Sequence, residues 1–325
     1  MFFCRILPLP LIGSIQPASF GTEAHKLALL EVATLKKTVI HQLPNPESQV
    51  IGVTVDEKWI IWSEASRQPD FGDWTLYAYN RSNGTIKTVA TAPTGADGQP
   101  LAGAFLLPKV DQDTVVWPEA QPGTPNIAIK SVNLVTGQST TLTKAGLAPA
   151  ISWPNVAWIE PTNEPSKQVV GASKGVITVQ NLETGLKKTL LNPDTPLFFS
   201  IYKNSIVWVS GKGQELILTD LAETKQQIIA TTSSSDTFQF PTMNDKLVAW
   251  SSYEKFGVWD RQQQKLIDFK VPVANELING NAFMWISLSH EVTDKTSTKP
   301  DTSQFYYLID SSVLPTTMLS SFFTL

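Results

Sequence analysis

Short apolar runs that end in tryptophan recur along this chain, and each is followed by a second apolar run that closes on Asn or Asp. The tryptophans are spaced at intervals of about 35 to 55 residues. They are Trp62, Trp117, Trp158, Trp208, Trp250 and Trp285. The residues that close the second runs are Asn80, Asn133, Asn181, Asp220, Asp260 and Asp310. A repeat of this length, built from short strands and tight turns, predicts an all-β fold of the β-propeller class.

Each repeat is expected to form one blade, a four-stranded antiparallel sheet. Around Trp208 the four strands fall in residues 196–204, 205–211, 215–225 and 226–232. Turn-forming residues separate the first strand from the second in every repeat. These pairs are Asp56-Glu57, Gln112-Asp113, Pro154-Asn155, Lys203-Asn204, Asn244-Asp245 and Gly280-Asn281. Gly84, Gly137 and Gly185 lie in third-to-fourth turns, where a tight hairpin needs the positive φ that glycine adopts without strain.

The repeated tryptophan and the repeated Asn or Asp both have structural interpretations. The second strands are nearly continuous apolar runs, which indicates that neighbouring blades cover both of their faces. The tryptophans are therefore expected in the core between blades and not in ligand stacking. An Asn or Asp side chain can accept a hydrogen bond from the backbone two residues on, so the residue that closes each third strand is expected to begin the following turn.

The ring is expected to contain seven blades in preference to six, within a single propeller domain over 21–325. The Trp-marked blades lie near 45–90, 102–144, 147–192, 196–232, 236–271 and 273–320. A hairpin over 26–32 and 37–43 would belong to the seventh, with a second strand from 5–12 and a first strand returned by 321–325. In the six-bladed alternative this hairpin packs outside the ring. Residues 1–20 form either a weak signal peptide or an ordinary N-terminal strand.

The repeats resemble those of bacterial TolB-like propellers over about residues 45–320. The matching residues are Ile206-Val207-Trp208 with Thr219-Asp220-Leu221, the run Asn181-Leu182-Glu183-Thr184-Gly185 and the run Asn133-Leu134-Val135-Thr136-Gly137. The chain departs from that family where Val55-Asp56-Glu57-Lys58 stands in place of the usual Ser-Pro-Asp-Gly turn. The resemblance implies a WD40-like binding or scaffolding propeller that is often extracytoplasmic and uses no cofactor.

Composition removes several function classes. The net charge of −4 and the absence of a Lys/Arg cluster argue against nucleic-acid binding. The single cysteine, Cys4, provides neither a disulfide framework nor a cysteine-based zinc site, and no metal site is predicted. No apolar run reaches the length of a transmembrane helix. The G-x-S-x-G elbow, a zincin motif after His290 and a Gly-rich phosphate loop are all missing from the sequence.

The candidate site follows from counting two residues past each tryptophan. The first three repeats place Glu64, Glu119 and Glu160 there, whereas the last three place serine. These positions lie where the second strand leaves toward the long connections 63–73, 118–125, 160–174, 286–304 and 91–104. Long insertions gathered at one end of the repeats often mark a binding face. Further candidates on those connections are Arg67, Asp73, Asp97, Lys167 and His290.

Two functions remain open from the sequence. The favoured one is a monomeric, non-catalytic propeller that binds another protein or a cell-surface polymer through its long connections. The alternative is a carbohydrate-active enzyme of the glycoside hydrolase or lyase type, in which two of the three glutamates act as a carboxylate pair. A third interpretation of the glutamates is structural, with each carboxylate accepting hydrogen bonds inside the scaffold.

Overall fold

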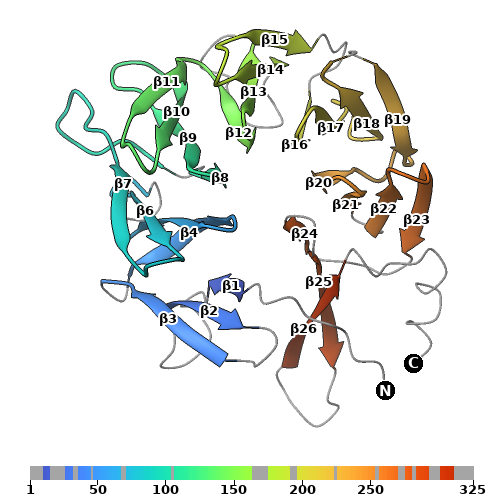
Figure 1. The fold of residues 1–325 in the computed structure, drawn as a ribbon, viewed down its shortest axis with the longest axis horizontal. Coiled ribbons are helices and arrows are strands. Elements are labelled where there is room, and N and C mark those ends of the chain that lie inside the picture. Colours follow the sequence, from blue (N-terminus) through green and yellow to red (C-terminus); the bar gives the residue numbers. More distant parts are fainter. Residues whose placement is uncertain are drawn as a thin grey trace. The chain divides into compact units, whose positions relative to one another are not determined.

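The computed structural model describes residues 10–14, 26–31, 36–44, 47–66, 71–103, 106–162, 175–190, 196–222, 225–252, 256–269, 275–279, 283–292 and 301–310. Its regular secondary structure is made of β-strands that pair with their neighbours along the chain. By its internal contacts the chain divides into two compact units, Met1–Thr189 and Leu190–Leu325. Figure 1 shows the strands of both units, which are described in turn.

The first unit holds four sheets, one of three strands and three of four strands. The three-stranded sheet consists of β1 (Pro10–Ser14), β2 (Lys26–Glu31) and β3 (Lys36–Gln42). The next consists of β4 (Gln49–Val55), β5 (Trp59–Ala65), β6 (Thr75–Asn80) and β7 (Ile86–Thr91). The third consists of β8 (Lys109–Asp111), β9 (Thr114–Ala120), β10 (Ile127–Asn133) and β11 (Ser139–Thr143). The fourth consists of β12 (Leu147–Ser152), β13 (Asn155–Pro161), β14 (Gly175–Asn181) and β15 (Lys187–Leu190).

The second unit holds two four-stranded sheets and one three-stranded sheet. The first consists of β16 (Phe199–Tyr202), β17 (Ser205–Val209), β18 (Glu215–Asp220) and β19 (Gln226–Thr231). The second consists of β20 (Gln239–Met243), β21 (Leu247–Ser251), β22 (Phe256–Asp260) and β23 (Lys265–Phe269). The third consists of β24 (Asn275–Asn279), β25 (Phe283–Val292) and β26 (Asp301–Asp310).

This succession of antiparallel sheets is that of a β-propeller, and the predicted fold class is confirmed. Seven sheets follow one another along the chain, which agrees with the preference for seven blades. The expected strand over 5–12 is placed at Pro10–Ser14, where it pairs with β2. The proposed returning strand at 321–325 lies outside the described residues. None of the described residues forms a helix that is long and apolar enough to cross a membrane.

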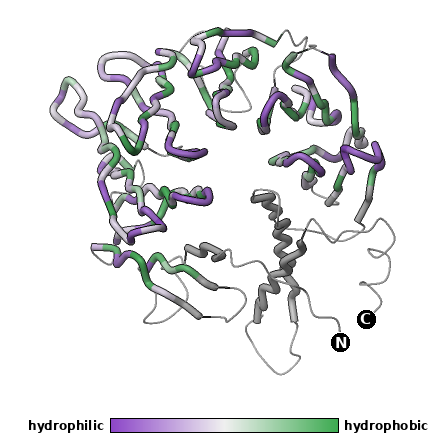
Figure 2. Tube along the Cα trace, in the orientation of Figure 1, coloured by the Kyte–Doolittle hydropathy of each residue, from purple (hydrophilic) through white to green (hydrophobic). Residues whose placement is uncertain are grey.

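The repeated tryptophans are core residues, as predicted. Trp62, Trp117, Trp158, Trp208 and Trp250 are each at most 3% exposed. Their clusters join neighbouring sheets: Trp62 packs with Leu27 of β2, and Trp158 with Val116 of β9. The second strands are therefore covered on both faces. Figure 2 shows hydrophobic and hydrophilic segments that alternate along the described chain. The side chain of Trp285, in β25, lies outside the described part of the chain.

The predicted turn chemistry is also present. Oδ1 of Asn133 accepts the backbone N–H groups of Val135 and Thr136 at 3.0 and 2.8 Å. Asn80, Asn181, Asp220 and Asp260 begin their turns through the same kind of bond. Gly84, Gly137 and Gly185 have φ values of 73°, 74° and 74°. Glycine is suited to these positions because a Cβ would be strained there.

The two turns of each blade meet at one end of its sheet. In five sheets the residue after the Asn or Asp donates its backbone N–H to the carbonyl of the first-to-second turn. The pairs are Arg81 with Lys58, Leu134 with Asp113, Leu182 with Pro154, Leu221 with Asn204, and Arg261 with Lys246. We call this the turn end of a sheet. The opposite end, where the second-to-third and inter-sheet connections lie, is the loop end.

Candidate functional site

The connection between β7 and β8 is the longest described feature at the loop end of the first unit. Residues 93–101 fold back on themselves: Leu101 donates its backbone N–H to the carbonyl of Pro93 at 2.8 Å, and Gly95 donates to Gln99 at 2.7 Å. The tip, residues 96–99, is exposed. Asp97 lies in this tip and accepts the backbone N–H of Gln99 at 3.0 Å. The connection is thus an ordered hairpin that presents a polar tip.

The base of this hairpin is anchored on the blade beneath it. Ala92 donates its backbone N–H to the carbonyl of the buried Trp74 at 2.9 Å. Gly103 lies so close to the Trp74 ring that a Cβ there would come within 2.1 Å of it. Ser63 Oγ, at the end of β5, donates to the carbonyl of Leu106 at 3.1 Å. These contacts hold the start and end of the connection while its tip faces solvent.

Glu64, the first of the three predicted carboxylates, is 5% exposed. Its Oε2 accepts the indole N–H of Trp62 at 3.3 Å and lies 2.8 Å from Nε2 of His41. His41, on β3, also packs against Trp62 and Tyr77, with ring centroids 5.2 and 5.6 Å apart. Burial, and then the charge of Glu64, raise the pKa of the Tyr77 hydroxyl. Glu64 therefore links its own sheet to β3 of the neighbouring sheet through its contact with His41, which packs among aromatic rings.

Glu119 and Glu160 are half-buried and are bonded within their own sheets. Glu119 accepts the indole N–H of Trp117 at 3.2 Å and lies 3.5 Å from the Lys130 ammonium on β10. Glu160 accepts the hydroxyl of Thr178, on β14, at 2.8 Å. Among the described residues, no hydrogen bond or ion pair joins any two of the three glutamates. In two of the three repeats the Trp-x-Glu pattern gives a buried indole N–H its acceptor.

The other predicted site residues are spread over separate connections. Asp73 is exposed and accepts both the backbone N–H and the hydroxyl of Ser66, which closes the β5–β6 connection. His290 lies in β25, opposite Ser303 in the register, and its side chain is outside the described part of the chain. Arg67 and Lys167 fall outside the described residues. In the ranges given above, no group of three or more His, Cys, Asp or Glu could hold a metal ion.

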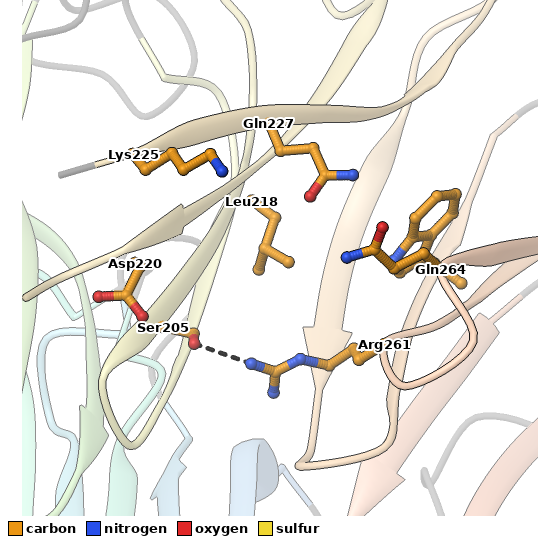
Figure 3. Close-up of a pocket in the computed structure, with 8 residues that line it drawn as sticks. Ser205, Leu218, Asp220, Lys225, Gln227, Arg261 and Gln264 are labelled. Atoms are coloured by element: carbon orange, nitrogen blue, oxygen red, sulfur yellow. Dashed lines mark hydrogen bonds between the residues drawn. The ribbon is translucent and has the colours of Figure 1, made fainter. Parts of the chain in front are cut away.

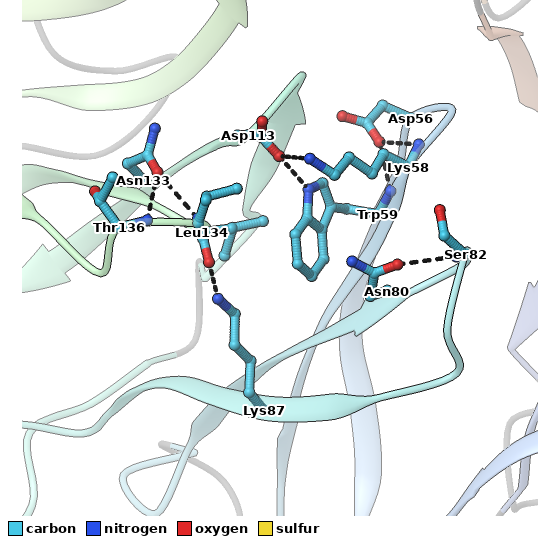
Figure 4. A network of polar contacts seen from close by, with 11 residues as sticks. Asp56, Lys58, Trp59, Asn80, Ser82, Lys87, Asp113, Asn133, Leu134 and Thr136 are labelled. Atoms are coloured by element: carbon cyan, nitrogen blue, oxygen red, sulfur yellow. Dashed lines mark hydrogen bonds and ion pairs between the residues drawn. The ribbon is translucent and has the colours of Figure 1, made fainter.

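A polar network at the turn end of the first unit was not predicted from the sequence (Figure 4). Asp113 lies in the turn after β8 and contacts the preceding sheet, β4–β7. Its carboxylate accepts hydrogen bonds from the Lys58 ammonium at 2.6 Å and from the Trp59 indole N–H at 2.8 Å. The Lys87 ammonium lies 5.1 Å from the centroid of the Trp59 ring and donates to the carbonyl of Leu134. The indole of Trp59 thus fills the junction between the two sheets.

Two carboxyl groups in this network have pKa values shifted in opposite directions. Burial raises the pKa of Asp56 to about 6. The hydrogen bonds from the backbone N–H groups of Trp59 and Lys58 act to lower this pKa, and the negative charges of Asp111 and Asp113 act to raise it further. Burial also acts to raise the pKa of Asp113, but hydrogen bonds from Lys58 and Trp59 outweigh it and hold that pKa below its usual value. The sequence pattern identified Asp113 as a turn residue. It could not identify Lys58 as its partner, because the two residues are 55 positions apart in the chain.

Comparison with known proteins gives a likeness in fold. A scan against protein-family models and a search of curated proteins found no match. Among solved structures, an oligogalacturonate lyase in complex with manganese is 11% identical, with a TM-score of 0.55 over 94% of this chain and 82% of that one. A post-proline cleaving enzyme from Rickettsia typhi is 10% identical, with a TM-score of 0.61 over 88% of this chain and 48% of that one.

TolB from Acinetobacter baumannii is 13% identical, with a TM-score of 0.45 over 80% of this chain and 62% of that one, which is too low to argue from. The chain spans about half the length of the Rickettsia enzyme. The first two names describe a lyase and a post-proline cleaving enzyme, so likeness in fold does not decide function. The chain is similar in fold to the lyase and the post-proline cleaving enzyme, and the relation to TolB-like repeats remains a prediction.

Proposed function

We propose that this protein is a non-catalytic, monomeric propeller that binds another protein or a cell-surface polymer through its loop end. The observation that carries the proposal is the β7–β8 hairpin, whose base is fixed on Trp74 and Ser63 while its polar tip stays exposed. A preorganised loop loses less conformational entropy when it binds, which favours affinity. The resemblance to TolB-like repeats supports an extracytoplasmic location, which fractionation of the native host would test.

The engaged state of the glutamates also favours binding over hydrolysis. A glycosidase needs one carboxyl group to protonate the leaving oxygen and another free to attack or to activate water. Glu64 and Glu119 are instead bonded to the indoles of their own blades, and each has a second basic partner, His41 or Lys130. These contacts support a structural role for both carboxylates.

The hairpin tip can be tested against a matched pair on the turn end. The binding variant is Asp97→Asn with Gln99→Ala; the control is Glu183→Gln with Gln138→Ala, which also changes one acid and one glutamine at exposed positions. With the purified protein as bait in host extract and on a panel of surface polysaccharides, we expect the tip variant to lose at least tenfold in captured partner. Equal capture by the tip variant and wild type would overturn the proposal.

The enzyme alternative has a separate test. We expect no turnover of polysaccharides or aryl glycosides by the wild-type protein. Turnover that is abolished by Glu119→Gln, with the thermal unfolding midpoint preserved, would replace the binding proposal with a carbohydrate-active one.

A further inference from the structure

The second unit contains a pocket of about 210 Å³ at the turn end, between the sheets β16–β19 and β20–β23 (Figure 3). Its lining combines charged, amide and apolar side chains. They are Ser205, Leu218, Asp220, Lys225, Gln227, Trp259, Arg261 and Gln264. This end carries only short turns, so loop length gave no reason to expect a site here.

At this pocket a small residue stands at a blade position that Trp59 occupies in one blade of the first unit and that the smaller Thr114 and Asn155 occupy in two others. Trp59 is paired with Asn80, the residue that begins the third-to-fourth turn, and Ser205 is paired with the corresponding Asp220. Trp59 and Ser205 therefore occupy the same place in their blades. The indole of Trp59 fills its junction with the next sheet, whereas the hydroxymethyl group of Ser205 leaves the equivalent junction open.

Arg261 supplies the anion-binding group of the pocket. Its guanidinium donates to Ser205 Oγ at 2.8 Å and to the carbonyl of Asn244, which fixes its position across the junction. A guanidinium has five N–H donors in a planar fork that matches a carboxylate. Two of these donors bond Ser205 and Asn244 and hold the guanidinium in place. The carboxylates of Asp245 and Asp220 lie close enough to act on its charge.

The charges around the pocket favour a monoanion over a dianion. Arg261 and Lys225 carry positive charge, and Asp220 and the neighbouring Asp245, which both act on the Arg261 charge, carry negative charge. The two carboxylates would repel a dianion such as hydrogen phosphate more strongly than a ligand with a single negative charge. Gln227 and Gln264 provide amide donors and acceptors, and Trp259 and Leu218 provide apolar surface for the body of the ligand.

The size of the pocket limits the ligand further. Pockets for drug-sized molecules measure roughly 300–1,000 Å³. A pocket of about 210 Å³ accommodates a group of the size of one amino acid or one sugar ring. From the fixed guanidinium, the repulsion of a dianion and the mixed lining, we propose that this junction binds a small monocarboxylate, either as a free molecule or as the acidic side chain of a protein partner.

The chain itself offers well-matched variants for a test. Leucine occupies the position of Arg261 in three other blades, at Leu134, Leu182 and Leu221, so Arg261→Leu is expected to fold. Arg81 is the other arginine at this position, and it likewise donates to the carbonyl of its own first turn, that of Asp56, at 2.8 Å. Arg81→Leu is therefore the control. Ser205→Trp is a second, independent variant that fills the pocket.

The probes are N-acetylalanine, its neutral amide, inorganic phosphate, and capped Ala-Glu-Ala and Ala-Gln-Ala peptides. Binding is followed by the ¹⁵N–¹H signal of the Trp259 indole, assigned with Trp259→Phe. We expect N-acetylalanine or the Glu peptide to give saturable shifts, and the neutral amide and the Gln peptide to bind at least tenfold more weakly. Arg261→Leu and Ser205→Trp should each bind the carboxylate probe at least tenfold more weakly than wild type. Arg81→Leu should bind it as wild type does.

The two carboxylate probes distinguish the sources of the ligand. Binding of N-acetylalanine alone indicates a free small carboxylate, and equal or tighter binding of the Glu peptide indicates an acidic side chain of a partner. The proposal is overturned if neither probe gives a saturable shift, if the amide binds as well as the acid, if phosphate binds more tightly than either carboxylate, or if Arg261→Leu binds like wild type. Thermal unfolding of each variant checks that it is folded.

Discussion

The junction at Trp59 and the junction at Ser205 are built on the same backbone frame and have opposite character. At the first, an indole, two lysines and Asp113 fill the space between the sheets. At the second, Ser205 and Gln227 stand at the positions of Trp59 and Lys87, and a polar pocket remains. The blade repeat fixes where a junction lies, and at these two junctions one or two side chains differ between the closed state and the open one.

The largest effect is expected from opening the closed junction with Trp59→Ser. The indole is 5% exposed, and removing it leaves a cavity and takes away the N–H that Asp113 accepts. Large-to-small substitutions of buried aromatic residues cost about 3–5 kcal/mol. Urea unfolding should show a loss of this size. A loss below about 1 kcal/mol would mean that the indole does not hold this junction.

Asp113→Ala tests the polar half of the same junction. The Lys58–Asp113 pair is partly exposed, so its own contribution is small. The cost arises mainly from the Trp59 indole N–H, which loses its acceptor inside the junction. We expect a loss of about 1–3 kcal/mol in the free energy of unfolding. Glu57→Ala, at an exposed turn position, is the control and should be nearly neutral.

Asp56 and Asn244 offer a comparison of charge at equivalent turns. Oδ1 of each accepts two backbone N–H groups: those of Lys58 and Trp59 for Asp56, and those of Lys246 and Leu247 for Asn244. Because the pKa of Asp56 is raised from 3.8 to about 6, the folded state holds the proton more tightly than the unfolded chain. The free energy of unfolding should therefore fall as the pH rises from about 4 to 6.

Asp56→Asn keeps the accepting oxygen and removes the charge, as Asn244 does naturally. We expect this variant to flatten the pH dependence of stability between about pH 4 and 6, measured by urea unfolding at several pH values. Asp260→Asn, at an Asx turn, provides the control. If the wild-type slope persisted in Asp56→Asn, another group would have to account for it.

The smallest effect on stability is expected from closing the open junction with Ser205→Trp. The pocket has room for much of an indole, and the added apolar burial offsets the loss of the Ser205–Arg261 hydrogen bond. The free energy of unfolding should change by about 1 kcal/mol or less. A loss near that of Trp59→Ser would show that the two junctions are not interchangeable.

Features that depend on local spacing were predictable. The second-strand tryptophans, the Asx turns and the glycines at positive φ all depend on residues close together in the chain, and they were found where the pattern placed them. Glu64 shows the limit of prediction from local spacing. Its place beside Trp62 followed from the two-residue period of a strand, but its bond to His41 depends on how a neighbouring sheet packs.

The sequence by itself determined the repeat, the strands, the turn chemistry and the tryptophan core, because each is marked by short apolar runs and turn-forming residues that lie close together in the chain. The tertiary structure alone decided what lies between the blades. Asp113 meets Trp59 across 54 residues and Arg261 meets Ser205 across 56, and neither contact follows from any local pattern. Between the Trp59 and Ser205 junctions, which share the same backbone frame, the size of the side chain at one position differs together with the change from a filled space to a pocket.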